Sequence, residues 1–174
     1  GGREFRDSHC VNSISYNEAM AVSSNIGAIK TGLRLGKDRF YKYVRQFGFG
    51  ETTGIELPAE TRGQLRAPQS WNGDSLASMS IGYEIGVTAL QTASAFAIIA
   101  NDGVRVRPHI IKEIRHADGK IFSATEVVKT PVVSQETARQ LRKMLQKVVL
   151  SGTGKRAAIS GYTSAGKTGT AWKY

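Results

Sequence analysis

The chain has 174 residues, of which 40% are hydrophobic and 22% are charged, a composition typical of one folded domain and inconsistent with a disordered chain. Its longest nearly apolar run, residues 93–100, is far shorter than the roughly 20 residues that cross a bilayer, so a membrane anchor would lie outside this sequence. The single cysteine, Cys10, excludes an internal disulfide, and three scattered histidines add no metal-ligand spacing. We therefore expect neither a metal ion nor a cofactor, and we interpret Cys10 as structural or incidental.

The net charge of +10 is concentrated in the second part of the chain. Residues 1–100 carry 10 Lys or Arg against 9 Asp or Glu, whereas residues 101–174 carry 14 against 5. A segment with this excess of positive charge could bind anionic partners such as nucleic acid, lipid or another polymer. Because the basic residues are spread over expected helices and strands, we interpret them as a solvated surface and expect no nucleic acid. A non-catalytic basic module that binds an anionic polymer remains an alternative.

A Ser-x-x-Glu capping box at Ser15 predicts a short helix that begins near Tyr16. Three short polar residues, 23–25, interrupt this helix, because their side chains compete for backbone hydrogen bonds. They place a helix–helix junction there, from which polar side chains can project into a cleft. The second helix is expected to end at Gly36, and its apolar face consists of Ile26, Ile29 and Leu33.

Asp38 is the expected N-cap of a third helix, which ends at Gly48 and has an apolar stripe of Phe40, Tyr43, Val44 and Phe47. Residues 50–74 predict a long loop region. A second capping box at Thr88 begins a helix over residues 89–100. That helix is apolar nearly all round, so we expect it to be buried.

Residues 104–115 have the composition of a strand, which Pro108 breaks or confines to a sheet edge. Asp118-Gly119 predicts a hairpin turn, with a return strand that begins at Ile121. Ser134 is the expected cap of the last clear helix, whose buried face consists of Ala138, Leu141, Leu145, Val148 and Val149.

The final stretch, residues 160–172, fits three motifs that share one lysine. Residues Gly161 to Thr168 match the P-loop pattern Gly-x-x-x-x-Gly-Lys-Thr, which would make the protein a nucleotide binder. A P-loop must open a helix, however, and the residues after Thr168 are poor helix formers. Residues 164–167 also match Ser-x-x-Lys, but Gly166 disfavours the helix on which that spacing works, so we interpret this match as a coincidence.

The third motif is Lys167-Thr168-Gly169, which follows Ser23-Ser24-Asn25 after 141 intervening residues. These are two of the three elements of penicillin-binding proteins and serine β-lactamases, namely Ser-x-x-Lys, Ser-x-Asn and Lys-Thr-Gly. Each element alone is weak evidence. Their order, separation and predicted structural contexts make the combination much more specific.

From about Tyr16 to its end, the chain resembles the transpeptidase domain of a class B, monofunctional penicillin-binding protein. The Ser-Ser-Asn form is more similar to the septal, division-type branch than to elongation-type relatives, which often have Asp in place of Asn. Further segments carry the resemblance: residues 18–27, 47–55, 80–83, 87–91, 100–103, 152–154 and 165–171.

The resemblance implies an α+β protein with a partial penicillin-binding transpeptidase fold, which is related to serine β-lactamases. We expect a mostly helical subdomain, a hairpin and a Lys-Thr-Gly strand in one incomplete domain. Its segments would be a leading segment (1–14), a helical part with the Ser-x-Asn junction (15–103), a hairpin region (104–133) and a helix with the active-site strand (134–174).

The implied activity is that of a serine-type D,D-transpeptidase, which cross-links peptidoglycan stem peptides at D-Ala-D-Ala through an acyl-serine and binds β-lactams. In this family pattern Ser23 relays a proton to the leaving amine, and Lys167 polarises Ser23. Asn25 orients the general-base lysine and hydrogen-bonds the substrate amide. The substrate-binding residues would be Thr168, Gly169 and Thr170, with the amide of Thr170 contributing to an oxyanion hole.

The acylated serine of the family lies several tens of residues before Ser-x-Asn, but only 22 residues precede Ser23 and none forms Ser-x-x-Lys. We therefore expect this chain to be a fragment without the nucleophile, inactive alone and not acylated by a β-lactam. We expect the parent protein to be anchored at the extracytoplasmic face of a bacterial membrane, within a cell-wall synthesis complex.

Overall fold

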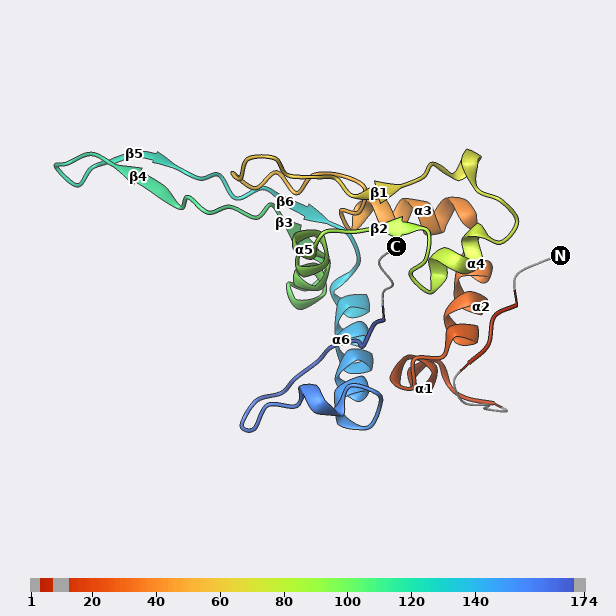
Figure 1. Ribbon diagram of the computed structural model, residues 1–174. Coiled ribbons are helices and arrows are strands. Elements are labelled where there is room, and N and C mark those ends of the chain that lie inside the picture. Colours follow the sequence, from red (N-terminus) through yellow and green to blue (C-terminus); the bar gives the residue numbers. More distant parts are fainter. Residues whose placement is uncertain (1–3, 8–12, 171–174) are drawn as a thin grey trace. The chain divides into compact units, whose positions relative to one another are not determined.

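The computed structural model describes residues 4–7 and 13–170 (Figure 1). They form two compact units, and the chain passes between them several times. The first unit consists of Gly1–Lys42, Arg66–Ile85 and Arg139–Tyr174, and the second consists of Tyr43–Leu65 and Gly86–Ala138. Cys10 lies outside the described residues, as do residues 171–174.

The first unit is helical. Its own helices are α1 (Tyr16–Ala21), α2 (Asn25–Leu35), α4 (Ser75–Ser80) and the short 3-10 helices η1 (Pro68–Ser70) and η2 (Lys155–Ala157). Two further helices, α3 (Lys37–Gln46) and α6 (Gln135–Leu150), contribute residues to both units. Helix α2 packs against α1 and α4, and Gly32 lies so close to Ser80 that a Cβ atom there would overlap its hydroxyl. Buried apolar side chains complete this core: Ala21, Ile29, Met79, Leu145, Val148 and Val149.

The second unit contains α5 (Ala89–Ala100) and the strands β1 (Gln64–Leu65), β3 (Val104–Val106), β4 (Glu113–Arg115), β5 (Ile121–Ala124) and β6 (Lys129–Pro131). The two-residue strand β2 (Ile85–Gly86) lies where the chain enters it. Strand β3 pairs antiparallel with β6, and β4 pairs antiparallel with β5. Figure 1 shows β4 and β5 toward the far end of a long two-stranded arm.

A buried glutamine holds the long loop of the second unit. Gln91 is 1% exposed, and its Nε2 donates to the carbonyl oxygens of Glu51 (2.7 Å) and Arg62 (3.0 Å). Its Oε1 accepts from the amide of Thr88 (2.9 Å), which completes the predicted capping box of α5. Each polar atom of this side chain has a hydrogen-bond partner, and these hydrogen bonds compensate for the loss of water on burial.

Most of the predicted helix signals are confirmed, and two are wrong. The capping box at Ser15 begins α1, and Ser134 caps α6 by accepting from the amide of Thr137 (3.1 Å). Asp38 is not the N-cap of α3, because that helix already begins at Lys37. Asp38 lies instead in the first helical turn. Leu33 belongs to the predicted apolar face of α2, but it is 56% exposed, so this end of the face is not covered within the described residues.

Helix α5 is not buried all round. Gln91, Ala95 and Ile98 form its buried face, whereas Phe96 is 40% exposed. An apolar sequence favours burial, but only a packed neighbour can provide it, and the described residues cover one side of this helix.

The expected Lys-Thr-Gly strand is not formed either. Residues 163–170 have no regular secondary structure. A strand requires backbone pairing with a neighbour, and within the described ranges no strand lies beside this segment.

The N-terminal segment is fixed by a carboxylate at the start of α2. Asp7 accepts hydrogen bonds from Ser24 Oγ (2.7 Å) and from the amide of Ile26 (3.0 Å). Burial by itself would raise the pKa of Asp7, but these hydrogen bonds to its charged form outweigh burial and hold the pKa below its ordinary value of 3.8.

We predict that Asp7→Asn lowers the free energy of unfolding by about 1–2 kcal/mol at pH 7, because charge-assisted hydrogen bonds at a helix start are lost. A carboxyl group with a lowered pKa stabilises the fold above its ordinary pKa of 3.8 and loses that contribution as the pH falls through the folded-state value. The difference between wild type and variant should therefore shrink at pH 3, as measured by urea unfolding at both pH values. Glu4→Gln is the control, because the ion pair of Glu4 with Arg6 is exposed; equal losses in both variants would contradict the assignment.

We also predict that Gly152→Ala destabilises the chain by about 1–3 kcal/mol, since overpacking displaces backbone. A Cβ atom at Gly152 would overlap the carbonyl oxygen of Ala21 and lie 2.9 Å from that of Val148, and neither backbone group is free to move. Thermal unfolding measures the loss. Gly73→Ala is the matched control, because a Cβ atom there meets nothing within 4 Å; a Gly152 variant as stable as this control would disprove the close approach.

Candidate active site

Ser23 lies in the turn that joins α1 to α2, and its backbone adopts a left-handed conformation with φ of 57°. Such a conformation costs of the order of 1–3 kcal/mol for a residue other than glycine, so the surrounding structure must hold it. Two backbone hydrogen bonds close the turn, from Ser23 to Met20 (3.3 Å) and from Ser24 to Ala19 (2.9 Å). The polar run that interrupts the helices therefore builds a tight turn around the predicted catalytic serine.

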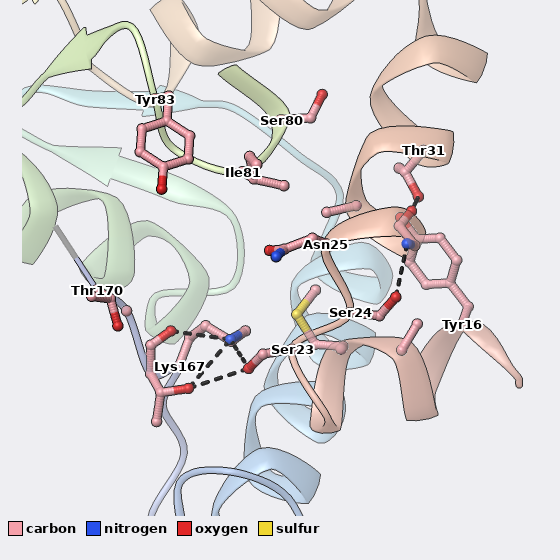
Figure 2. A pocket seen from close by; sticks show the side chains of 16 residues that line it. Tyr16, Ser23, Ser24, Asn25, Thr31, Ser80, Ile81, Tyr83, Lys167 and Thr170 are labelled. Atoms are coloured by element: carbon pink, nitrogen blue, oxygen red, sulfur yellow. Dashed lines mark hydrogen bonds between the residues drawn. The ribbon is translucent and has the colours of Figure 1, made fainter. Parts of the chain in front are cut away.

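Lys167 connects the C-terminal stretch to this turn (Figure 2). Its Nζ donates a hydrogen bond to Ser23 Oγ and another to the backbone oxygen of Thr168 at 3.0 Å. Thr168 Oγ1 lies 3.5 Å from the same nitrogen. The structure thus brings together two predicted catalytic residues that are 144 positions apart in the sequence.

The environment of Lys167 favours proton exchange. Partial burial lowers the pKa of its ammonium group below the ordinary value of 10.5, because desolvation disfavours the charged form. The hydroxyl and carbonyl oxygens around Nζ are neutral acceptors, so they orient the group without supplying a countercharge. A lysine of lowered pKa in contact with a hydroxyl is an arrangement that can supply a proton to that hydroxyl.

A pocket of about 470 Å³ opens beside this pair, and every residue that lines it belongs to the first unit. All six residues predicted for the site line the pocket: Ser23, Asn25, Lys167, Thr168, Gly169 and Thr170. Tyr16, Ile81 and Tyr83 also line it and add aromatic and aliphatic surface (Figure 2). Local sequence pattern assigned no role to these three, because neither periodicity nor a motif distinguishes a pocket wall from a core position.

Asn25 is the first residue of α2, and Figure 2 shows its side chain extending into the pocket. Its Nδ2 donates to the backbone oxygen of Arg6 at 3.2 Å, so the N-terminal segment helps to orient the amide. The preceding residue, Ser24, caps the helix, because its Oγ accepts a hydrogen bond from the amide of Gly27 (2.9 Å). Helix capping is thus the role of Ser24, whereas the hydroxyl of Ser23 contacts Lys167 and Asn25 lines the pocket.

The Lys-Thr-Gly segment forms one wall of the pocket, and the amide of Gly166 just before it donates to the oxygen of Leu145 in α6 (3.2 Å). Residues 167–170 are not helical, so Lys167 and Thr168 do not open the helix that a P-loop requires. The coincidental Ser-x-x-Lys match is likewise not on a helix.

Sequence reasoning assigned no role to Thr153, although this residue is in direct contact with the site. Its Oγ1 lies 3.0 Å from Ser23 Oγ and 2.8 Å from Thr168 Oγ1, and Ser23 Oγ lies 3.2 Å from Thr168 Oγ1. Three hydroxyl groups therefore form a closed triangle next to the Lys167 ammonium. The only sequence signal was the Gly152-Thr153-Gly154 run within the family resemblance.

Within the described ranges, no group of three or more His, Cys, Asp and Glu residues is placed to hold a metal ion. The same part of the chain contains no helix with the length and hydropathy needed to cross a membrane.

Residues 3–174 match the family described as penicillin binding protein transpeptidase domain. Similar proteins include PbpB of Mycolicibacterium smegmatis, 40% identical over 180 residues, and stage V sporulation protein D of Bacillus subtilis, 37% identical over 161 residues. These alignments cover 98% and 91% of this chain but only 28% and 25% of the relatives, so the chain spans about a quarter of their length.

Solved structures agree with the sequence relationship. The fold is similar to that of penicillin binding protein 3 of Mycobacterium tuberculosis in complex with aztreonam, with a TM-score of 0.85 and 38% identity over 90% of this chain and 37% of that structure. The same protein with ampicillin gives a TM-score of 0.85 at 39% identity over 89% of this chain and 36% of that structure. Given this match and the Ser-x-Asn and Lys-Thr-Gly elements that meet at the pocket, the chain belongs to the penicillin-binding protein transpeptidase domain family.

Proposed function

We propose that this chain supplies the substrate-binding wall and proton relay of a serine-type D,D-transpeptidase that cross-links peptidoglycan stem peptides and is acylated by β-lactams. The observation that carries the proposal is the contact between Lys167 Nζ and Ser23 Oγ at the edge of a 470 Å³ pocket. The proposal is also supported by a relative from Neisseria meningitidis, 31% identical, that is named a probable peptidoglycan D,D-transpeptidase.

The substrate of this reaction ends in a carboxylate, and the pocket has groups suited to it. Lys167 supplies a cation, and Thr168 and Thr170 supply hydroxyl donors on the same wall. Gly169 has no side chain to obstruct a peptide that lies along the segment, and a Cβ atom there would meet nothing within 4 Å. Together they would bind the terminal D-Ala and hold its amide bond beside Ser23.

Acylation breaks the bond between the penultimate carbonyl carbon and the nitrogen of the terminal D-Ala, or the amide bond of a β-lactam. An attacking serine, which the family pattern places outside this sequence, forms the new ester bond and gives its hydroxyl proton to the general-base lysine of the same Ser-x-x-Lys element. The leaving nitrogen takes the proton of Ser23 Oγ, and Lys167 Nζ returns a proton to Ser23. We assign Asn25 to the substrate amide and the amide of Thr170 to the developing oxyanion.

For the parent protein we propose anchoring at the extracytoplasmic face of the bacterial membrane and work within a cell-wall synthesis complex. A role in cell division rests on the Ser-Ser-Asn form of residues 23–25. Peptidoglycan stem peptides and β-lactams would be its ligands, without nucleic acid or cofactor.

The proposal predicts that Ser23→Ala and Lys167→Ala each slow acylation of the full-length protein by a fluorescent penicillin about 100-fold or more, the range for loss of a positioned proton donor. The second-order rate constant of labelling measures the effect. Lys155→Ala is the matched control, because Lys155 lies in η2 and is not among the residues that line the pocket. The 174-residue chain alone should remain unlabelled; an unimpaired Lys167→Ala protein would refute the relay.

The lowered pKa of Lys167 predicts the pH dependence of acylation. The charged ammonium must donate to Ser23, so the rate should fall as the pH rises through a pKa that lies below 10.5. Lys167→Arg keeps a cation that does not titrate in this range, so the alkaline decline should disappear even if the rate is lower. A pH profile of the second-order rate constant from pH 6 to 10.5 tests both, and an unchanged alkaline limb in Lys167→Arg would exclude Lys167 as its source.

A further inference from the structure

Thr153 contacts two residues that line the pocket but does not line the pocket itself. It follows α6, it is not among the residues that line the pocket, and its hydroxyl contacts both Ser23 and Thr168. We propose that Thr153 is a positioning residue that fixes the Ser23 hydroxyl for proton transfer. The inference rests on the proposed transpeptidase function and assigns a further residue to the same site.

The backbone of Thr153 is fixed on both sides, although the residue as a whole is exposed. Its amide donates to the oxygen of Ala21 at the end of α1 (3.0 Å), and the amide of Gly154 donates to Val148 of α6 (2.9 Å). Gly152 allows the close approach, because any side chain there would overlap the Ala21 carbonyl. The loop therefore joins the end of α6 to the residues just before Ser23, and it holds the Thr153 hydroxyl at a defined position.

Counting donors and acceptors shows what this hydroxyl does. A serine hydroxyl has one proton and two lone pairs, whereas the Lys167 ammonium only donates. Thr153 Oγ1 lies 3.5 Å from the Ala21 oxygen but 3.0 Å from Ser23 and 2.8 Å from Thr168, so the hydroxyl oxygens are its close partners. Either oxygen of each hydroxyl pair in the triangle can donate. In the arrangement in which Thr168 donates to Thr153, and Thr153 and Lys167 both donate to Ser23 Oγ, the two lone pairs of Ser23 are taken and its proton is left for the leaving nitrogen.

The same geometry separates Thr153 from Thr168. Thr168 lines the pocket, so changing it alters substrate binding and the hydroxyl triangle together. Thr153 contacts Ser23 without lining the pocket, so its removal should affect the chemical step and leave binding unchanged. Without Thr153, the Ser23 hydroxyl keeps its contacts with Lys167 and Thr168 but is less tightly oriented. The loss of one orienting hydrogen bond corresponds to a rate decrease of about 3- to 10-fold.

The test uses the full-length protein that contains this chain and a fluorescent penicillin, with the acylation rate constant and the apparent dissociation constant resolved by stopped flow. Thr153→Val keeps the shape and removes the hydroxyl, so the rate constant should fall 3- to 10-fold with an unchanged dissociation constant. Thr153→Ser should restore the rate. Ser151→Ala is the control in the same loop. The Ser151 hydroxyl donates to the backbone oxygen of Lys147, away from the hydroxyl triangle, so both constants should stay at wild-type values.

A double-mutant cycle shows whether Thr153 acts through Ser23. In a Ser23→Ala background, measured at high penicillin concentration over longer times, Thr153→Val should cause no further decrease. The same decrease in both backgrounds, a change confined to the dissociation constant, or no effect of Thr153→Val would overturn the inference. A wild-type protein that is not acylated at all would instead refute the proposed function, so the two failures are distinguishable.

Discussion

An ammonium group held against a serine hydroxyl joins two parts of this chain that are 144 residues apart. Lys167 donates to Ser23, and the remaining geometry of the pocket follows from that contact, since it places the Lys-Thr-Gly segment opposite the start of α2. The contact needs both partners to be fixed independently. The turn after α1 fixes Ser23, and the tether of Gly166 to α6 limits the position of the lysine.

The turn itself depends on polar contacts from two other segments, the one that contains Asp7 and the loop after α6. Ser23 adopts an unfavourable left-handed backbone, which local sequence preference would not choose. Asp7 holds Ser24 and the first amides of α2 from one side, and the loop after α6 holds Ala21 from the other. The unfavourable backbone conformation of Ser23 is thus held in place by hydrogen bonds to its neighbours in the turn.

The sequence predicted those features whose cause is local. Capping boxes at Ser15 and Thr88 began helices where expected, because the side chain and the amides it satisfies lie within one turn. Asp38 shows the limit of this reasoning. An acidic residue is favourable in the first helical turn as well as at the N-cap, and α3 begins at Lys37, one residue before Asp38. Exposure of Leu33 and Phe96 was not predictable from periodicity, which identifies an apolar face but not whether a neighbour covers it.

The sequence by itself determined the family and six of the residues that border the pocket, because Ser-x-Asn and Lys-Thr-Gly are short motifs whose side-chain chemistry can be interpreted without coordinates. It also predicted the hairpin at residues 118–119. Only the tertiary structure decided that Ser23 and Lys167 touch, that Asp7 and Thr153 support them, and that residues 163–170 form no strand. The physical reason is that hydrogen bonds between segments separated in the sequence, by 17 residues for Asp7 and Ser24 and by 144 for Ser23 and Lys167, depend on which neighbours the fold supplies, and so does the pairing of a strand.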